Sequence, residues 1–239
     1  MSLESKKALE AMLGAPRLDR YLLETQNNLS EAVELYHWNV RLAGALHSQL
    51  SYFEVLTRNA MDKALREWNS IECGHNDWTV EHKTAPLLYS MIRRPIDQAR
   101  RRAEKIAQSK SSYLGNQNVY ITHDDIIAQL TLGNWSNLLG EALPIHKPNS
   151  KILWEACLHT AFPHIENSDQ SRENLGKKFE RLTRLRNRVA HQENLLKTNV
   201  RHRINDSLSV LRSINPEYPR WVMSNNQIRQ IAREDPRKR

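Results

Sequence analysis

The residues best suited to chemistry are Arg186, Asn187 and His191, which lie near the end of one predicted helix. RNA carries its own nucleophile, the 2′-hydroxyl, so a protein can cleave it by supplying an acid or base and a cation for the charge that develops on phosphorus. Histidine titrates at about pH 6.5, and the guanidinium of arginine binds phosphate oxygens without losing its charge. These residue types therefore predict RNA cleavage that requires no metal.

The spacing of these residues leaves their arrangement open. At 100° per residue, Asn187 and His191 share a helix face, whereas Arg186 lies about 140° around the helix from His191. Both side chains could reach one phosphate if the arginine wraps around the helix, or if two copies of the helix face each other. The alternative is a surface cluster without a catalytic role, because the helix dipole favours cations near a C-terminus.

The elements that must position these residues are predicted to be helices, because no segment alternates apolar and polar residues as a half-buried strand does. The longest predicted helix has Ser30 as its N-cap and extends to about residue 68. One face of it carries an apolar row: Leu35, Leu42, Leu46, Leu50, Phe53, Leu56, Ala60 and Ala64. The helix that ends at His191 has the core stripe Phe179, Leu182, Leu185 and Val189. The fold class is therefore predicted to be all-α, a helical bundle with one long helix in its N-terminal half.

Proline, glycine and capping residues mark the other predicted boundaries. Pro95 predicts the first turn of a helix that ends near residue 108, and Thr122 predicts the N-cap of a helix that Gly133 ends. Further helices are expected over about 149–163, 171–191, 199–213 and 225–234, with a loop at 72–84 and a polar connector at 109–118. The 239 residues contain no repeat, so we expect one domain over residues 1–235 and a basic tail at 236–239.

Charge and composition limit the classes of function. The 35 lysines and arginines exceed the 27 acidic residues and give a net charge of +8, which favours a polyanionic partner such as RNA. No apolar run is long enough for a membrane span, and the charged first ten residues do not resemble a secretory signal, so we expect a cytoplasmic protein. The two cysteines are far apart and the histidines are scattered, so we expect no metal site and no cofactor.

The motif and the segments around it resemble the Abi-like family of abortive-infection proteins, in the HEPN superfamily. Arg186 and His191 match the R-x4-6-H motif of that superfamily, and Asn187 matches the polar residue that follows the arginine. The resemblance covers roughly residues 17–222. It includes four blocks in the family's order, at 36–40, 52–60, 130–135 and 153–154 leading to 161–163.

The resemblance implies an all-helical HEPN fold that forms a homodimer, in which two motif helices build one RNA-cleaving cleft. It implies that Arg186 and His191 form the catalytic pair and that Asn187 assists them. It also implies that a Glu-x-x-x-Arg-Asn block on the long helix contributes to RNA binding, matched here by Glu54, Arg58 and Asn59. The alternative for Glu54 and Arg58 is an ordinary ion pair between residues four apart on a helix.

The chain departs from the family directly after the motif. Family members read His-His-Glu-Pro, whereas this chain reads His191-Gln192-Glu193-Asn194, so the second histidine and the proline are absent. Glu193 also stands where one HEPN subset carries a tyrosine that a partner enzyme modifies. The sequence therefore argues against control by modification at that position.

The expected function is an endoribonuclease that acts in phage defence or as a toxin and is restrained by a protein or RNA antitoxin. One alternative is a non-catalytic RNA-binding module, in which phosphates are contacted by the basic tail and by Arg100, Arg101, Arg102, Arg184 and Arg188. Another is an interaction module with no nucleic-acid activity. Five tryptophans could stack on bases, although their helical spacing favours the core: Trp68, Trp78, Trp135, Trp154 and Trp221.

Overall fold

The computed structural model describes residues 3–114 and 120–238, and this part of the chain contains helices and no strand. The all-α prediction is therefore confirmed. The described α-helices are α1 (Leu3–Leu13), α2 (Ala15–Glu24), α3 (Leu29–Cys73), α4 (Pro86–Leu114), α5 (His123–Ile127), α6 (Leu132–Asn137), α7 (Lys147–Ala156), α8 (Asp169–Ala190), α9 (Val200–Ile214), α10 (Tyr218–Met223) and α11 (Ile228–Arg233). The chain also forms short 3-10 helices at Glu81–Lys83, Pro144–His146, Leu158–Ala161 and Pro236–Lys238.

The chain folds into two compact units. The first unit combines the chain up to Tyr52 with Leu185–Asn205 and the chain from Arg220 onward. The second unit combines Phe53–Arg184 with Asp206–Pro219. Because α3, α8, α9 and α10 each contribute residues to both units, this division does not decide whether residues 1–235 form the single expected domain, which stays a prediction.

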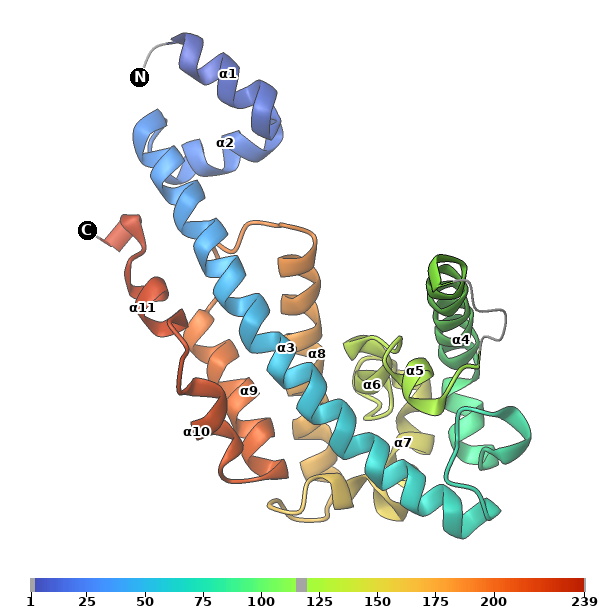
Figure 1. Ribbon diagram of the computed structural model, residues 1–239. Helices are drawn as coiled ribbons and strands as arrows, with labels where there is room; N and C mark the ends of the chain where they lie inside the picture. The colour runs from blue at the N-terminus through green and yellow to red at the C-terminus, as the bar shows by residue number, and fades with distance from the viewer. Residues whose placement is uncertain (1–2, 115–119, 239) are drawn as a thin grey trace. The chain divides into compact units, whose positions relative to one another are not determined.

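The N-terminal part of α3 forms the centre of the first unit. Tyr21 of α2 packs edge-on against Tyr36 of α3, with 5.2 Å between the ring centroids. On another side of α3 lies α11 (Figure 1), where the indole N–H of Trp38 donates to the carbonyl of Ile231 at 2.7 Å. The predicted stripe residues of this part of α3, Leu35, Leu42, Leu46 and Leu50, are all buried.

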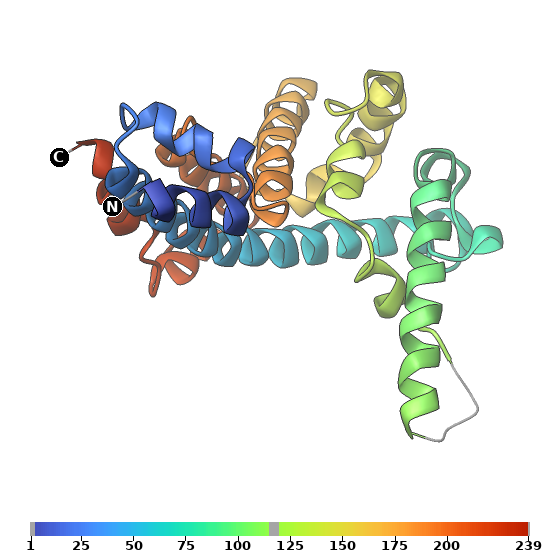
Figure 2. The same cartoon turned by 90° about the horizontal axis from the view of Figure 1, so that it is seen from above.

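Aromatic side chains form the core of the second unit. Phe53 of α3 contacts Phe179 of α8, which in turn meets Phe162 edge-on. Trp78 and Trp135 pack against each other, and both are buried together with Trp154. The four predicted stripe residues of α8 are buried as well, two in each unit. On the surface of this unit, α5 packs against α4 (Figure 2).

Two predicted helix starts are wrong. The N-cap of α3 is Asn28, whose side-chain oxygen accepts the N–H groups of Ser30 and Glu31, so Ser30 lies inside the first turn. Pro95 lies inside α4, which begins nine residues earlier at Pro86. A proline inside a helix removes one backbone hydrogen bond, and the burial of Met91, Ile92 and Ile96 around it outweighs that loss.

Several predicted ends are also wrong. Thr122 is the N-cap of its helix, as expected, and forms a capping box with Asp125, but α5 ends at Ile127. A second capping box, between Thr131 and Asn134, starts α6, so Gly133 lies inside a helix instead of ending one. Two short helices with their own caps therefore replace the single predicted one.

The remaining differences concern lengths. The segment predicted at 149–163 consists of α7 and a separate 3-10 helix, and the segment predicted at 225–234 contains only α11. Residues 109–114 continue α4 and do not form a connector, while residues 115–119 lie outside the described residues. The helices predicted at 171–191 and 199–213 match α8 and α9 within two residues.

A buried arginine fixes the start of α8 within the second unit. The side chain of Arg172 is 2% exposed, and its Nε donates to Asp169 at 2.6 Å while Nη1 donates to the carbonyl of Leu139 at 2.5 Å. The adjacent Gly140 has φ +82°, and a Cβ at that position would lie 2.8 Å from Ser150. The arginine therefore joins α8 to a turn that only glycine fits.

We predict that Arg172→Ala lowers the free energy of unfolding by about 3 kcal/mol, because it leaves the buried Leu139 carbonyl without its donor and removes a buried cation from its partners. Lys177→Ala is the matched control, since its ion pair with Glu173 is exposed and contributes about 0.5 kcal/mol or less. Urea denaturation measures both values. Similar losses in the two variants would contradict the structural role of Arg172.

Candidate functional site

The C-terminus of α8 places the predicted catalytic residues. The helix ends at Ala190, and Gln192 takes a left-handed conformation with φ +54°. The N–H of Gln192 donates to Val189 at 3.1 Å, and the N–H of Glu193 donates to Arg188 at 2.9 Å. This pair of bonds is a Schellman motif, which usually has glycine at the left-handed position. His191 is therefore the C-cap residue, fixed between the last helical turn and a sharp reversal of the chain.

Side chains from α8, α2 and α3 hold this turn within the first unit. Arg188 donates to the carbonyl of Asn194, and its Nε lies 3.4 Å from the carboxylate of Glu193. Arg17 of α2 donates to the carbonyl of Gln192 at 2.6 Å. Asn39 of α3 accepts the N–H of Leu195 at 2.7 Å in a buried bond. The backbone that carries His191 is thus restrained by the last turn of α8 before it and by the bonds to residues 192–195 after it.

The three predicted catalytic residues lie together in the first unit. Asn187 and His191 are exposed, and Arg186 is half-buried. The N–H of His191 donates to the carbonyl of Asn187 at 2.9 Å, so the backbone at His191 keeps helical spacing from Asn187. The exposed side chain of His191 is accessible from solvent.

The predicted RNA-binding residues are divided between the two units. Arg188 belongs to the first unit, while Glu54, Arg58, Asn59 and Arg184 belong to the second. Glu54 and Arg58 form the ion pair that the alternative interpretation expected, at 3.3 Å and with side chains 16% and 17% exposed. Arg184 pairs with Glu180 four residues earlier, and Asn59 is exposed. A role of these residues in RNA binding stays a prediction.

The other residues considered for RNA contact have mixed positions. Arg100 donates to the carbonyl of Thr79 at 2.8 Å, whereas Arg101 and Arg102 are exposed. Trp78, Trp135 and Trp154 are buried, as their spacing favoured, and Trp68 is half-buried. Trp221 is 59% exposed and meets Tyr52 edge-on. In the basic tail, Arg237 forms ion pairs with Asp235 and Glu24.

One cluster of titratable side chains has no counterpart in the sequence-based predictions. The ring of His123, 8% exposed, lies between two carboxylates in the second unit, with 2.9 Å from Nδ1 to Asp77 and 2.9 Å from Nε2 to Asp62. Asp62 also accepts the indole N–H of Trp78 and lies 4.0 Å from Arg66. Asp62 and Asp77 are 15 residues apart, and Asp77 and His123 are 46 residues apart, so no local sequence motif contains the cluster.

Both ring nitrogens of His123 face carboxylate oxygens, so the charged imidazolium is the form that satisfies both. Burial by itself would lower the pKa of His123, but the hydrogen bonds and charges of Asp62 and Asp77 outweigh it and raise that pKa above its usual value. Burial would raise the pKa of Asp77, but hydrogen bonds from Thr79 and His123 hold it below its usual value. The cluster is a buried ion network, with both ring nitrogens already engaged.

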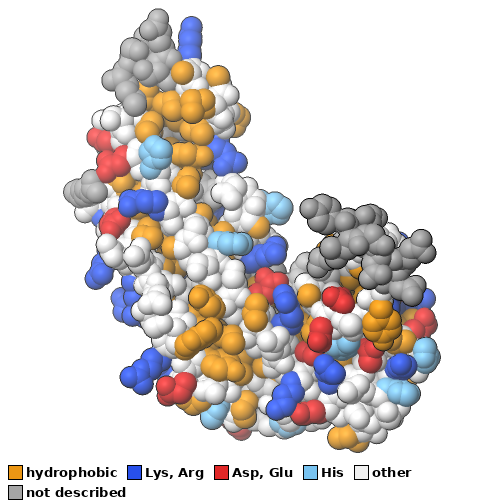
Figure 3. All heavy atoms as spheres, viewed as in Figure 1, with side chains coloured by type: hydrophobic (Ala, Val, Ile, Leu, Met, Phe, Trp, Pro, Cys, Tyr) orange, Lys and Arg blue, Asp and Glu red, His pale blue; other side chains and the backbone are white. Residues whose placement is uncertain are grey.

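The face in Figure 3 shows lysine and arginine side chains spread among acidic and apolar ones, so net charge alone does not locate a site. Among the described residues, no group of three or more His, Cys, Asp or Glu side chains is arranged to hold a metal ion. None of the described helices combines the length and apolar content that crossing a membrane requires.

No family model, curated protein or solved structure matches the chain.

We predict that Gln192→Gly raises the free energy of unfolding by about 0.5–1 kcal/mol. Glycine avoids the cost of a left-handed backbone, of about 1–2 kcal/mol, and offsets part of this gain by its freedom in the unfolded chain. Gln192→Ala is the control, because it removes the same side chain and keeps the Cβ. Equal stability of the glycine and alanine variants in urea denaturation would show that the turn carries no strain.

We predict that His123 makes stability depend on pH. Because its folded pKa is raised, its contribution is fully present below the unfolded value of about 6.5 and is lost as pH rises through the folded pKa. His123→Asn should therefore flatten the fall in unfolding free energy above about pH 6.5. The exposed His82 provides the control variant, His82→Asn, which should retain the wild-type slope. A His123 variant with that same slope would refute the prediction.

Proposed function

We propose that this protein is a metal-independent endoribonuclease of the HEPN type, similar to Abi-like proteins, that acts in abortive infection or as a toxin. The observation that carries the proposal is the exposure of His191 at a restrained turn and of Asn187 one helical turn earlier in α8, with Arg186 five residues before the histidine in the same unit. A structural role for the histidine would favour burial or a local partner. An accessible imidazole on a fixed backbone suits a proton-transfer group better.

In the proposed reaction, His191 removes the proton from a 2′-hydroxyl, and the 2′-oxygen attacks the adjacent phosphorus. Arg186 stabilises the extra negative charge on the phosphate oxygens, and the amide of Asn187 donates a further hydrogen bond. The bond from phosphorus to the 5′-oxygen then breaks as that oxygen takes up a proton. The products are an RNA end with a 2′,3′-cyclic phosphate and an RNA end with a 5′-hydroxyl.

A single imidazole cannot be base and acid at the same moment, and Arg186 points about 140° away from His191 on an ideal helix. Both points favour a homodimer in which two copies of the α8 C-terminus contribute to one cleft, since twofold pairing is the commonest oligomer. A toxic ribonuclease also needs restraint, so a protein or RNA antitoxin belongs to the proposal. Two residues after His191, the carboxylate of Glu193 forms an ion pair with Arg188 and so has a structural contact.

A non-catalytic RNA-binding module is the second candidate function. A groove in the first unit that is lined by basic residues such as Arg201, Arg229 and Arg233 favours it, because such a groove can bind RNA whether or not the strand is cut. Binding without cleavage is the result that would select this candidate.

We predict that the purified protein cleaves RNA in the presence of EDTA and leaves 2′,3′-cyclic phosphate ends. His191→Ala should lower the cleavage rate by about 10²- to 10⁴-fold, the usual contribution of a general acid or base. Arg186→Lys should also be impaired, because it keeps the charge and loses the planar fork. Denaturing gels and mapping of the RNA ends measure both effects.

His47→Ala is the matched control, since this exposed histidine of α3 also belongs to the first unit and lies outside the motif. It should cleave at the wild-type rate. Activity of His191→Ala equal to that of His47→Ala would eliminate the proposed mechanism. For a dimeric enzyme, the rate per protein molecule should also fall when the protein is diluted far enough to dissociate.

A further inference from the structure

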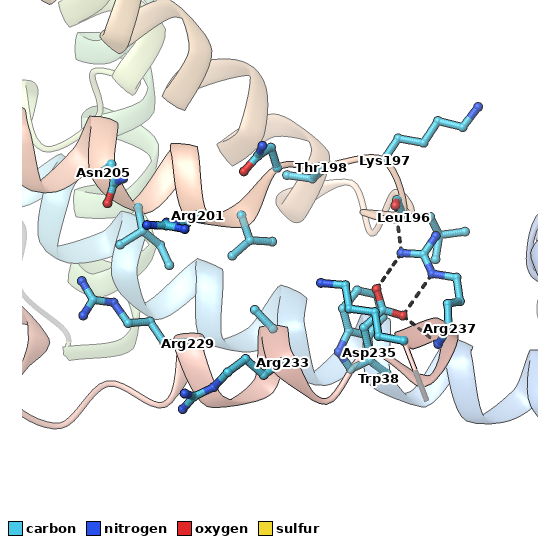
Figure 4. Close-up of a pocket in the computed structure, with 15 residues that line it drawn as sticks. Trp38, Leu196, Lys197, Thr198, Arg201, Asn205, Arg229, Arg233, Asp235 and Arg237 are labelled. Carbon is cyan, nitrogen blue, oxygen red and sulfur yellow. Dashed lines mark hydrogen bonds and ion pairs between the residues drawn. The ribbon is translucent and has the colours of Figure 1, made fainter.

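A groove in the first unit gathers cationic side chains around a cavity of about 860 Å³ (Figure 4). Its walls come from the segment that leads into α9, from the first turns of α9 and from α11 with the residues after it. Six of the lining side chains are basic and one is acidic: Lys197, Arg201, Arg229, Arg233, Arg237 and Lys238, against Asp235. This is a local excess of positive charge in a hollow surface.

The carboxylates nearest to the groove already have partners. Asp235 is buried and accepts hydrogen bonds from Arg237 at 2.8 and 3.0 Å, shown as dashed lines in Figure 4. Arg237 also donates to the carbonyl of Leu196 at 3.0 Å. The neighbouring Glu234 pairs with Arg41 of α3 at 3.0 Å. These acidic groups therefore neutralise Arg237 and Arg41 and form no ion pair with the other five basic side chains of the groove.

The other five cations of the groove have no such compensation. Within residues 3–114 and 120–238, no carboxylate forms an ion pair with Lys197, Arg201, Arg229, Arg233 or Lys238, all of which are exposed. Arg201 projects from α9, while Arg229 and Arg233 project from α11, one helical turn apart (Figure 4). Cations that line one cavity from two elements make the potential there positive and attract an anion.

We propose that this groove binds the phosphate backbone of a single RNA strand next to the point of cleavage. That the strand is RNA rests on the proposed function. That the groove binds several linked phosphates rests on the basic residues that line it. Five uncompensated cations exceed what one phosphate group can use. The polar side chains of Thr198 and Asn205 add hydrogen-bonding groups along the same walls.

The chain connects the groove closely to the predicted catalytic residue. Leu196, which lines the groove, follows His191 by five residues, so their Cα atoms are at most about 18 Å apart. A nucleic-acid strand carries a phosphate about every 3.4 Å in duplex geometry, so about five nucleotides or fewer cover that distance. The backbone of His191 therefore lies within the length of one short stretch of RNA from the start of the groove.

The test uses a fluorescein-labelled 12-nucleotide uridine strand with 2′-O-methyl groups, which the proposed reaction cannot cleave. Fluorescence anisotropy measures its dissociation constant against salt for the full-length wild type and two triple variants. The groove variant is Arg201→Gln, Arg229→Gln and Arg233→Gln. The control variant, Arg20→Gln, Arg94→Gln and Arg212→Gln, removes the same charge from exposed positions outside the groove.

We predict that the groove variant binds the strand about 100-fold more weakly at about 0.1 M salt, and that its salt slope falls by about 2, since each phosphate contact on a single strand contributes about 0.7 to the slope. The control variant should retain the wild-type slope and bind within about twofold, because a few distant charges act only through screened long-range attraction. Circular dichroism melting confirms that both variants fold. Equal losses in the two variants would overturn the proposal.

Two further results separate the interpretations. Tripolyphosphate, added at the same phosphate concentration and constant ionic strength, should leave the strand bound; displacement of the strand would assign the groove to a compact anion and overturn the proposal. Cleavage of unmodified RNA is measured separately on the wild type. Absence of cleavage would refute the proposed function and leave the groove proposal intact. Wild-type affinity of the groove variant for the strand would refute the groove proposal and leave the proposed function intact.

Discussion

A helix that continued beyond Ala190 would carry Asn194 and Leu195 onward along its own axis, and His191 would be one of many side chains on a regular surface. The left-handed backbone at Gln192 prevents this. It turns the chain sharply, places His191 at the last position of α8 and directs the following residues back to Asn39. Arg188 and Arg17 then bind the carbonyl groups around the turn. The course of the segment into α9 and one wall of the groove both depend on this single reversal.

Periodicity in the sequence predicted which residues of the long helices are buried. The stripes of α3 and α8 were correct for most positions, because the burial of an apolar face is a property of spacing within one helix. Boundaries were less predictable, because several residues compete for the same role. Asn28 caps α3 in place of Ser30, and Pro86 starts α4 nine residues before Pro95. The capping box of Thr131 and Asn134 is a local pattern that competes with Gly133 as a boundary signal, whereas the burial around Pro95 depends on packing that no local pattern contains.

The candidate site was predictable only as a set of residue types. The motif identified Arg186, Asn187 and His191, and the structure gives them a common unit and an accessible surface. Long-range pairs were invisible in the sequence. The bond from the buried Arg172 to Leu139, the position of His123 between two carboxylates and the cations that line one groove from α9 and α11 each involve residues from distant segments. The role of each of these residues depends on partners that lie far from it in the chain.

The clamp between Arg237, Asp235 and Glu24 joins residues from opposite ends of the described chain. Arg237 also covers one face of the Trp38 ring, and 199 residues separate these two side chains. At a synthesis rate of about 5–20 residues per second, a ribosome needs roughly 10–40 s to progress from one to the other. Throughout that interval the nascent polypeptide has no completed groove. The order of translation itself thus delays the assembly of this surface until Arg237 has been synthesised.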